Sequence, residues 1–151
     1  MTKHLHDATL AADIRGRLAR LQPGAHAQWG RMSISQALAH LSAALEMAVG
    51  DQKPPRMFAG RFFGSAVKRL VMRDDSPLKR NTPTAPTLIV RDERDFERER
   101  QRLDALIQRF AEGGDATCTT HPHTFFGPMT PREWAVLQYK HLDHHLRQFG
   151  A

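Results

Sequence analysis

Apolar side chains recur along the chain at the three- and four-residue spacing of amphipathic helices, and the alternation typical of strands is nearly absent. Residues 87–90 are the one short run with some strand character. Together with capping signals, the pattern predicts helices over residues 8–21, 34–49, 57–72, 92–112 and 130–149. We therefore expect an all-α protein.

The beginnings of two of these helices are marked by capping boxes, in which two side chains three residues apart each satisfy a free backbone amide. Ser33 pairs with Gln36 in the first, and Thr130 pairs with Glu133 in the second. Residues 74–86 contain three prolines and must form a loop. The chain thus predicts a four-helix bundle with a long crossover between its second and third main helices.

The crossover carries the short helix predicted over residues 57–72, which is rich in phenylalanine and weakened by Gly60 and Gly64. Two interpretations are open. An amphipathic helix of this kind can lie on a membrane surface, but more often it caps the open end of a bundle with its apolar face. We expect the cap.

Length and composition indicate how many domains the chain forms and in which cellular compartment it is expected. A chain of 151 residues is long enough for one domain, over residues 1–151, with a core of its own. Cys118 is the only cysteine, which excludes an internal disulfide and favours a reducing cytoplasm. The first twenty residues lack the apolar block of a secretory signal, and the apolar region 37–49 is too short to span a membrane. We expect a soluble cytoplasmic protein.

The positive charge is concentrated in one segment. The chain has 22 Lys and Arg against 16 Asp and Glu, a net charge of +6. Residues 53–80 alone hold eight basic and two acidic residues, so the remainder is neutral on balance. Such a segment suits nucleic acid, an anionic membrane face or an acidic ligand. It is more often a solvated surface, and no nucleic-acid-binding motif accompanies it.

Two histidines on the last predicted helix are the first candidates for chemistry. His141 and His145 lie four residues apart, so their rings project from one face and can share a metal ion. Leu142 follows His141 where the HExxH metalloprotease motif requires Glu, which excludes that class. The pair shares its face with Trp134 and Leu137, so it points inward.

His40 offers a third ligand from the helix predicted over residues 34–49. It lies beside the apolar sector on a strip with Ala37 and Ala44, whose small side chains leave room for a ring to reach across. If the two helices are neighbours, three histidines can meet around one divalent cation with a further position open. A buried polar network is the alternative, since buried imidazoles need partners.

Longer stretches of sequence around these histidines resemble a known family. Residues 29–41 are Trp-Gly-Arg-Met-Ser-Ile-Ser-Gln-Ala-Leu-Ala-His-Leu, and residues 141–148 are His-Leu-Asp-His-His-Leu-Arg-Gln. Together they resemble the DinB-like (YfiT-type) superfamily of metal-binding four-helix bundles over nearly the whole chain. Residues 126–134, followed by Tyr139-Lys140-His141, are similar to a branch of that superfamily with no assigned function.

The resemblance implies a site and two kinds of chemistry. It implies that His40, His141 and His145 hold a divalent metal ion, usually zinc or nickel, and that homodimers are frequent. Characterised members activate the sulfur of a low-molecular-weight thiol, such as mycothiol or bacillithiol, for transfer or isomerisation. Others are described as metal-dependent hydrolases.

The choice between these reactions depends on a general base, and none is evident. Glu46 and Asp143 project away from the histidine faces, which leaves Gln138, Gln148 and Tyr139 as polar neighbours. A hydrolase is harder to support on this basis than a thiol transferase, which needs less proton transfer. No catalytic residue is assigned.

Other candidates have simpler interpretations. His121 and His123, on either side of Pro122, could act as loop ligands or gate residues, but such loops more often pack against a bundle rim. Cys118 has no neighbouring cation in sequence and is treated as incidental. The alternative function is a non-catalytic module that binds an acidic partner through residues 53–80, and nucleic-acid binding is a weaker third option.

Overall fold

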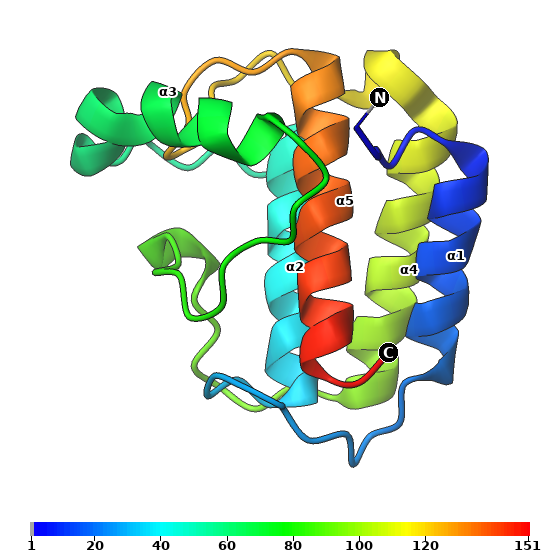
Figure 1. Cartoon of the computed structure of the whole chain (residues 1–151). Coiled ribbons are helices and arrows are strands. Elements are labelled where there is room, and N and C mark those ends of the chain that lie inside the picture. The colour runs from blue at the N-terminus through cyan, green and yellow to red at the C-terminus, as the bar shows by residue number, and fades with distance from the viewer. Residues whose placement is uncertain (1) are drawn as a thin grey trace.

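The computed structural model describes residues 2–151, which form five α-helices and two short 3-10 helices. Their bounds are α1 Ala8–Arg20, α2 Ile34–Val49, α3 Phe58–Met72, η1 Pro86–Leu88, α4 Phe96–Gly113, η2 Gly114–Thr117 and α5 Pro131–Gln148. Helices α1, α2, α4 and α5 stand side by side as a bundle (Figure 1). The predicted all-α fold, with a long crossover that carries a short helix, is confirmed.

Local capping explains where the helices begin. The capping boxes at Ser33 and Thr130 are both formed, with each side chain and its partner three residues on bonded to the other's backbone. The predicted start of the third main helix at residue 92 is wrong, because the side chain of Asp95 accepts from the amide of Arg98 and caps a helix that begins at Phe96. The weak strand signal at 87–90 is also wrong, since η1 occupies that position.

The bundle core forms where α2 contacts both α4 and α5 and α1 closes the other side of α4. Large side chains fill it completely, as expected for residues that recur on one helix face. The largest fully buried apolar side chains are Trp134, Phe110, Leu5, Ile14, Leu18, Leu38, Leu45, Leu103, Ile107 and Leu142. This packing sets α2 and α5 side by side, which is the condition for their histidines to meet.

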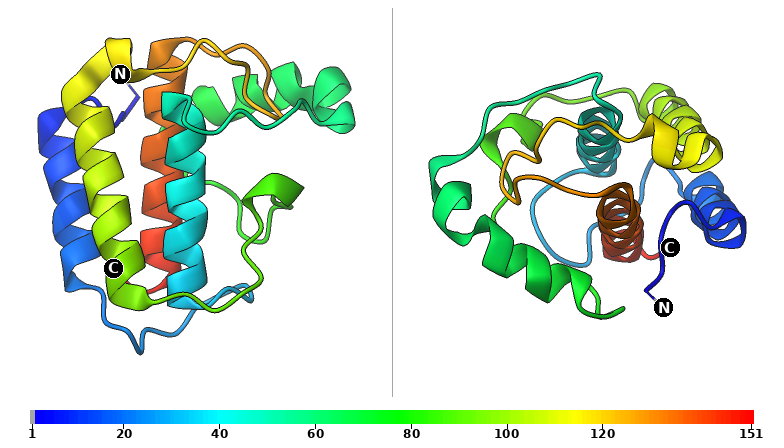
Figure 2. Two further views of the ribbon diagram at one scale, coloured as in Figure 1. Left: turned by 180° about the vertical axis from the view of Figure 1, so that it is seen from behind. Right: turned by 90° about the horizontal axis from the view of Figure 1, so that it is seen from above.

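Helix α3 does not cap the bundle as expected. It lies outside the four main helices, beside one end of α5 and roughly crosswise to it (Figures 1 and 2). Its buried residues are Gly60 and Gly64, whereas Phe58 and Phe62 are 79% and 67% exposed. The prediction of an inward apolar face is wrong because the glycines, rather than the phenylalanines, face the protein.

The rest of the crossover returns along the bundle to α2. Leu88 in η1 is buried in the core, and the side-chain amide of Gln36 donates to the carbonyls of Arg91 and Asp92. These contacts hold the segment after α3 against the first turns of α2. Among the described residues, no helix combines the length and apolar character needed to cross a membrane.

Candidate metal centre

Three histidine side chains from two helices meet between α2 and α5. The Nε2 atoms of His40 and His141 are 2.8 Å apart, and one nitrogen from each of His40, His141 and His145 lies within 4.8 Å of the others. The three ring centroids are separated by 4.7 to 4.9 Å. The residues named as candidate ligands from the sequence are therefore brought together.

Hydrogen bonds to the outer nitrogens fix the protonation of two of these rings. His40 Nδ1 lies 2.8 Å from the carbonyl oxygen of Leu88, which can only accept, so Nδ1 carries the proton. The amide nitrogen of Gln148 donates to the carbonyl of Trp29 at 2.7 Å, so the Gln148 oxygen accepts from His145 Nδ1, also at 2.7 Å. Both Nε2 atoms therefore carry lone pairs, and that of His40 accepts a hydrogen bond from His141 Nε2 at 2.8 Å.

This donor set fits a divalent metal ion. Zinc bonds to histidine nitrogen at about 2.0 to 2.1 Å in tetrahedral geometry, which places two ligand nitrogens roughly 3.4 Å apart. The Nε2 atoms of His40 and His141, at 2.8 Å, are closer than that by about 0.6 Å, so the two rings would separate slightly on binding a metal ion. Outer hydrogen bonds from Nδ1 to a carbonyl or an amide oxygen are also what metal-binding histidines usually make.

Burial keeps the three rings neutral, which is the form that binds metals. Desolvation lowers the pKa of His40, an effect that its bond to Leu88 partly offsets. Desolvation, followed by repulsion from His40, lowers the pKa of His145 to about 3. The pKa of His141 is well below its usual value for the same reasons. The rings can thus bind a cation at neutral pH without first losing a proton.

Carboxylates near the two helices are engaged elsewhere, as predicted. Asp143 forms ion pairs with Arg17 at 2.8 Å and with Arg147 at 2.9 Å. Glu46 pairs with Arg102 across α2 and α4. The group of converging ligands found in the described residues contains histidines alone. It offers three neutral nitrogen donors and no carboxylate general base.

Comparison with known families places the chain in one of them. The sequence profile of the family described as "Protein of unknown function (DUF1569)" matches residues 2–151. The chain belongs to the DUF1569 family. This family is part of the DinB-like clan, so the resemblance holds at clan level, while the YfiT-type assignment stays a prediction. Comparison with curated proteins and with solved structures gave no match.

The three polar residues predicted to lie near the histidines, Gln138, Tyr139 and Gln148, have different surroundings in this DUF1569 protein. Gln148 contacts a cluster histidine directly, as described above. Gln138 is buried on the same helix. Burial, and then the charge of Asp143, raise the pKa of Tyr139. Of the three predicted polar neighbours, Gln148 has the clearest role.

His121 and His123 are not part of the cluster. His123 is buried, and its Nδ1 accepts from the amides of Phe125 and Phe126 at 3.0 and 3.1 Å. Burial lowers its pKa to about 4, so the ring is neutral and shapes the turn that follows. Burial raises the pKa of Cys118 to about 11, which leaves its thiol protonated. These residues support the structure around the site.

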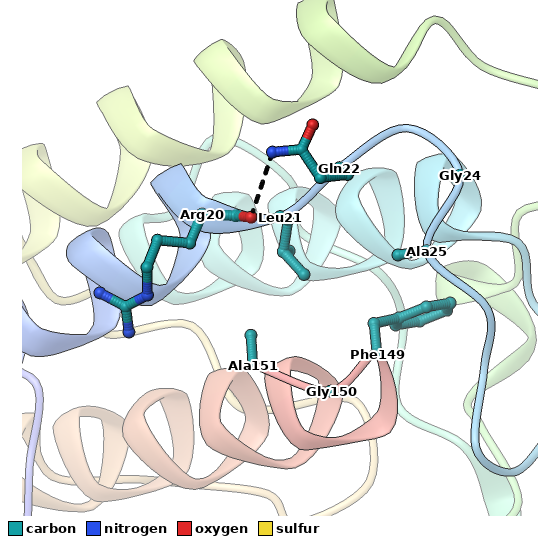
Figure 3. A pocket seen from close by; sticks show the side chains of 8 residues that line it. All are labelled: Arg20, Leu21, Gln22, Gly24, Ala25, Phe149, Gly150 and Ala151. Atoms are coloured by element: carbon teal, nitrogen blue, oxygen red, sulfur yellow. Dashed lines mark hydrogen bonds between the residues drawn. The ribbon is translucent and has the colours of Figure 1, made fainter.

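A separate pocket of about 520 Å³ lies at the end of the bundle where α1 stops and the chain ends (Figure 3). Its lining residues are Arg20, Leu21, Gln22, Gly24, Ala25, Phe149, Gly150 and Ala151. At its edge the side-chain amide of Gln22 donates to the carbonyl of Arg20 (Figure 3). The lining includes none of the three histidines, so this pocket is distinct from the candidate metal centre.

The backbone partners of the histidines were missed by sequence reasoning. The carbonyl of Leu88, in the crossover, accepts directly from His40, whereas that of Trp29, in the loop before α2, accepts from Gln148 and so acts on His145 only through that side chain. Every residue has a carbonyl, so no sequence signal distinguishes these two. The only side-chain signal for the outer contacts was Gln148, three residues after His145.

Replacing Gln148 by Leu is expected to weaken zinc binding about 10- to 100-fold, because His145 loses the acceptor that orients its ring. The measurement is competitive titration of metal-free protein against a chromophoric chelator. Gln108, whose side chain bonds to Glu112 on α4, provides the matched control as Gln108→Leu. Equal zinc affinity in the Gln148 variant and the control would show that this contact does not tune the site.

Proposed function

We propose that this chain is a metal-dependent enzyme in which His40, His141 and His145 hold one divalent cation, with zinc or nickel as the expected ion. The observation that carries the proposal is the arrangement of the outer hydrogen bonds. Leu88 and Gln148 both accept from Nδ1 atoms, which leaves the Nε2 atoms of His40 and His145 unprotonated on two neighbouring helices. The His40 lone pair accepts from His141 Nε2, a contact that a bound cation would replace.

A cation bound by three neutral imidazoles lowers the pKa of a coordinating thiol or water and so supplies a nucleophile near neutral pH. The protein contributes orientation, through the contacts of His40 and His145, and a buried setting that strengthens electrostatic interactions. His141 is partly exposed, whereas His40 and His145 are buried, so we expect a small molecule to approach the cluster from the side of His141.

We favour a low-molecular-weight thiol over water as the activated group. Hydrolysis normally needs a general base that accepts a proton from the attacking water. Glu46 and Asp143 are both tied to arginines, and Cys118 is a protonated thiol outside the cluster. A thiol transferase or isomerase places fewer demands on such residues, because a thiolate attacks directly.

Three measurements test the proposal. Untagged protein should contain close to one divalent ion per chain by elemental analysis, and anomalous scattering at the metal edge should locate it at the three histidines. Cobalt-loaded protein should develop a thiolate-to-cobalt charge-transfer band when a low-molecular-weight thiol is added. Folded protein without affinity for zinc, nickel or manganese would refute the metal site, and a cobalt spectrum unchanged by thiol would refute the thiol substrate.

A further inference from the structure

Helix α3 exposes an apolar band that the fold leaves uncovered. Five large hydrophobic side chains are exposed among the described residues, and four of them are on this helix. They are Phe58 at 79%, Phe62 at 67%, Phe63 at 63% and Leu70 at 64% exposure. A contiguous apolar surface of this kind usually marks an interaction site.

The orientation of this band is fixed by the rest of the protein. A Cβ atom added at Gly60 or Gly64 would collide with the carbonyl oxygen of Phe125, so the helix can pack closely only through its glycine face. The amide of Met57 donates to the carbonyl of Thr124 at 2.8 Å at one end of α3. The ammonium group of Lys140 donates to the carbonyl of Val71 at 2.7 Å at the other. The phenylalanines therefore cannot turn inward without breaking these contacts.

Positive charge accompanies the apolar band. Residues 53–73 contain six Lys and Arg and no Asp or Glu. Lys68 pairs with Glu133 on α5, whereas exposed Arg61 and Arg69 have no ion pair within residues 2–151. Arg69 follows Phe62 by seven residues, which is two helical turns, so it projects from the same outward face. This face offers apolar rings and guanidinium groups together.

We propose that α3 docks on the surface of an anionic phospholipid bilayer. An amphipathic helix that combines phenylalanine and leucine with basic side chains binds at the boundary between headgroups and acyl chains. Here Phe58 and Phe62 enter the acyl boundary while Arg61 and Arg69 bind lipid phosphates. The helix lies across the outside of the bundle, so it can lie flat on a membrane while the four main helices remain in water (Figure 2).

The charge and shape of this face favour a lipid surface over two other binding partners, a second copy of the chain and an acidic protein. A twofold dimer built on this face would bring two basic segments together, because such an interface pairs each patch with its own copy. An acidic protein would satisfy the arginines, but the exposed band is the convex outside of a helix with no groove to hold a partner's side chains. A bilayer accommodates a convex apolar surface and supplies many phosphates at once.

The experiment is flotation of the full-length protein with vesicles of phosphatidylcholine alone or mixed equally with phosphatidylglycerol. The protein should float with the mixed vesicles only, and added salt should weaken the binding. Phe58→Ser combined with Phe62→Ser should reduce the partition coefficient about tenfold or more, since two rings lose their insertion. Arg69→Gln should reduce it roughly fivefold.

Matched controls separate this docking from general effects. Ile89→Ser removes an exposed apolar side chain after η1, and Arg98→Gln removes an exposed charge from α4. Both should bind vesicles as the wild type does. Helical circular dichroism and zinc content should be unchanged in the α3 variants, so the outcome is independent of the proposed metal function.

Three results would overturn the proposal. The first is no flotation with the mixed vesicles. The second is a dimer in sedimentation velocity that dissociates in the double phenylalanine variant, which would assign the face to a second copy. The third is vesicle binding that is lost in Arg69→Gln but retained in the phenylalanine variant, which would mean attraction to anionic headgroups by charge alone, without docking of the apolar band.

Discussion

Replacing His141 by Ala is expected to remove nearly all bound metal while the fold remains intact. The rings of His40, His141 and His145 form a triangle with centroids 4.7 to 4.9 Å apart, and the loss of His141 leaves two nitrogen donors for the ion. Removing a direct ligand should lower the metal affinity by more than the 10- to 100-fold expected when a hydrogen-bond partner of a ligand is removed. Alanine also favours the helical backbone of α5. Elemental analysis and far-ultraviolet circular dichroism of the untagged proteins check both parts.

Thermal unfolding gives a second readout of the same substitution. A ligand at one hundred times its Kd stabilises the folded state by about 2.7 kcal/mol, so zinc should raise the Tm of the wild type. The His141→Ala variant should show no such rise. His26→Ala is the matched control, because His26 is exposed and outside the cluster, and it should behave as the wild type does. Full metal content in His141→Ala would exclude this histidine as a ligand.

Local signals in the sequence were sufficient for the helices and for part of the site. The capping boxes at Ser33 and Thr130 mark helix starts through contacts within four residues, which a sequence displays directly. The spacing of His141 and His145 places both rings on the inward face of one helix. The prediction that His40 is the third ligand agrees with the packing of α2 beside α5 and with the family match at clan level.

Long-range packing explains what the sequence did not predict. The outward phenylalanines of α3 result from the close approach of the Phe125 backbone to Gly60 and Gly64, and periodicity gives no sign of a glycine face. Asp92 and Asp95 are equivalent as caps in the sequence, and only the path of the crossover selects Asp95. The acceptor for His40 is a backbone carbonyl 48 residues away, which carries no side-chain signature.

Metal-free protein is expected to lose stability steeply as the pH falls below about 6.5. Burial holds the pKa of each cluster histidine below the 6.5 of an unfolded chain, and that of His145 falls to about 3. Between these values the unfolded state binds protons that the folded state does not, so the free energy of unfolding decreases as the pH falls. Above about pH 7.5 both states are neutral at these rings and the dependence disappears.

The size of this effect follows from the number of buried rings. Each histidine contributes at most about 1.4 kcal/mol per pH unit, over the range in which only its unfolded state is protonated, so three rings set an upper limit of about 4 kcal/mol per unit. Total stabilities are typically about 5 to 15 kcal/mol, so we expect acid unfolding of the metal-free protein with a midpoint between about pH 4 and 6. Urea unfolding at a series of pH values in the presence of a chelator measures the slope directly.

Replacing His40 by Gln measures how much one ring contributes to the pH dependence of the free energy of unfolding. His40→Gln keeps an amide N–H for the carbonyl of Leu88 and cannot bind a proton in this range, so the slope should fall by about one third. Zinc should move the acid midpoint of the wild type to lower pH, since protons and metal compete for the same lone pairs. An unchanged slope in His40→Gln would mean that His40 takes up its proton without unfolding. Its ring would then have to leave the cluster at acidic pH.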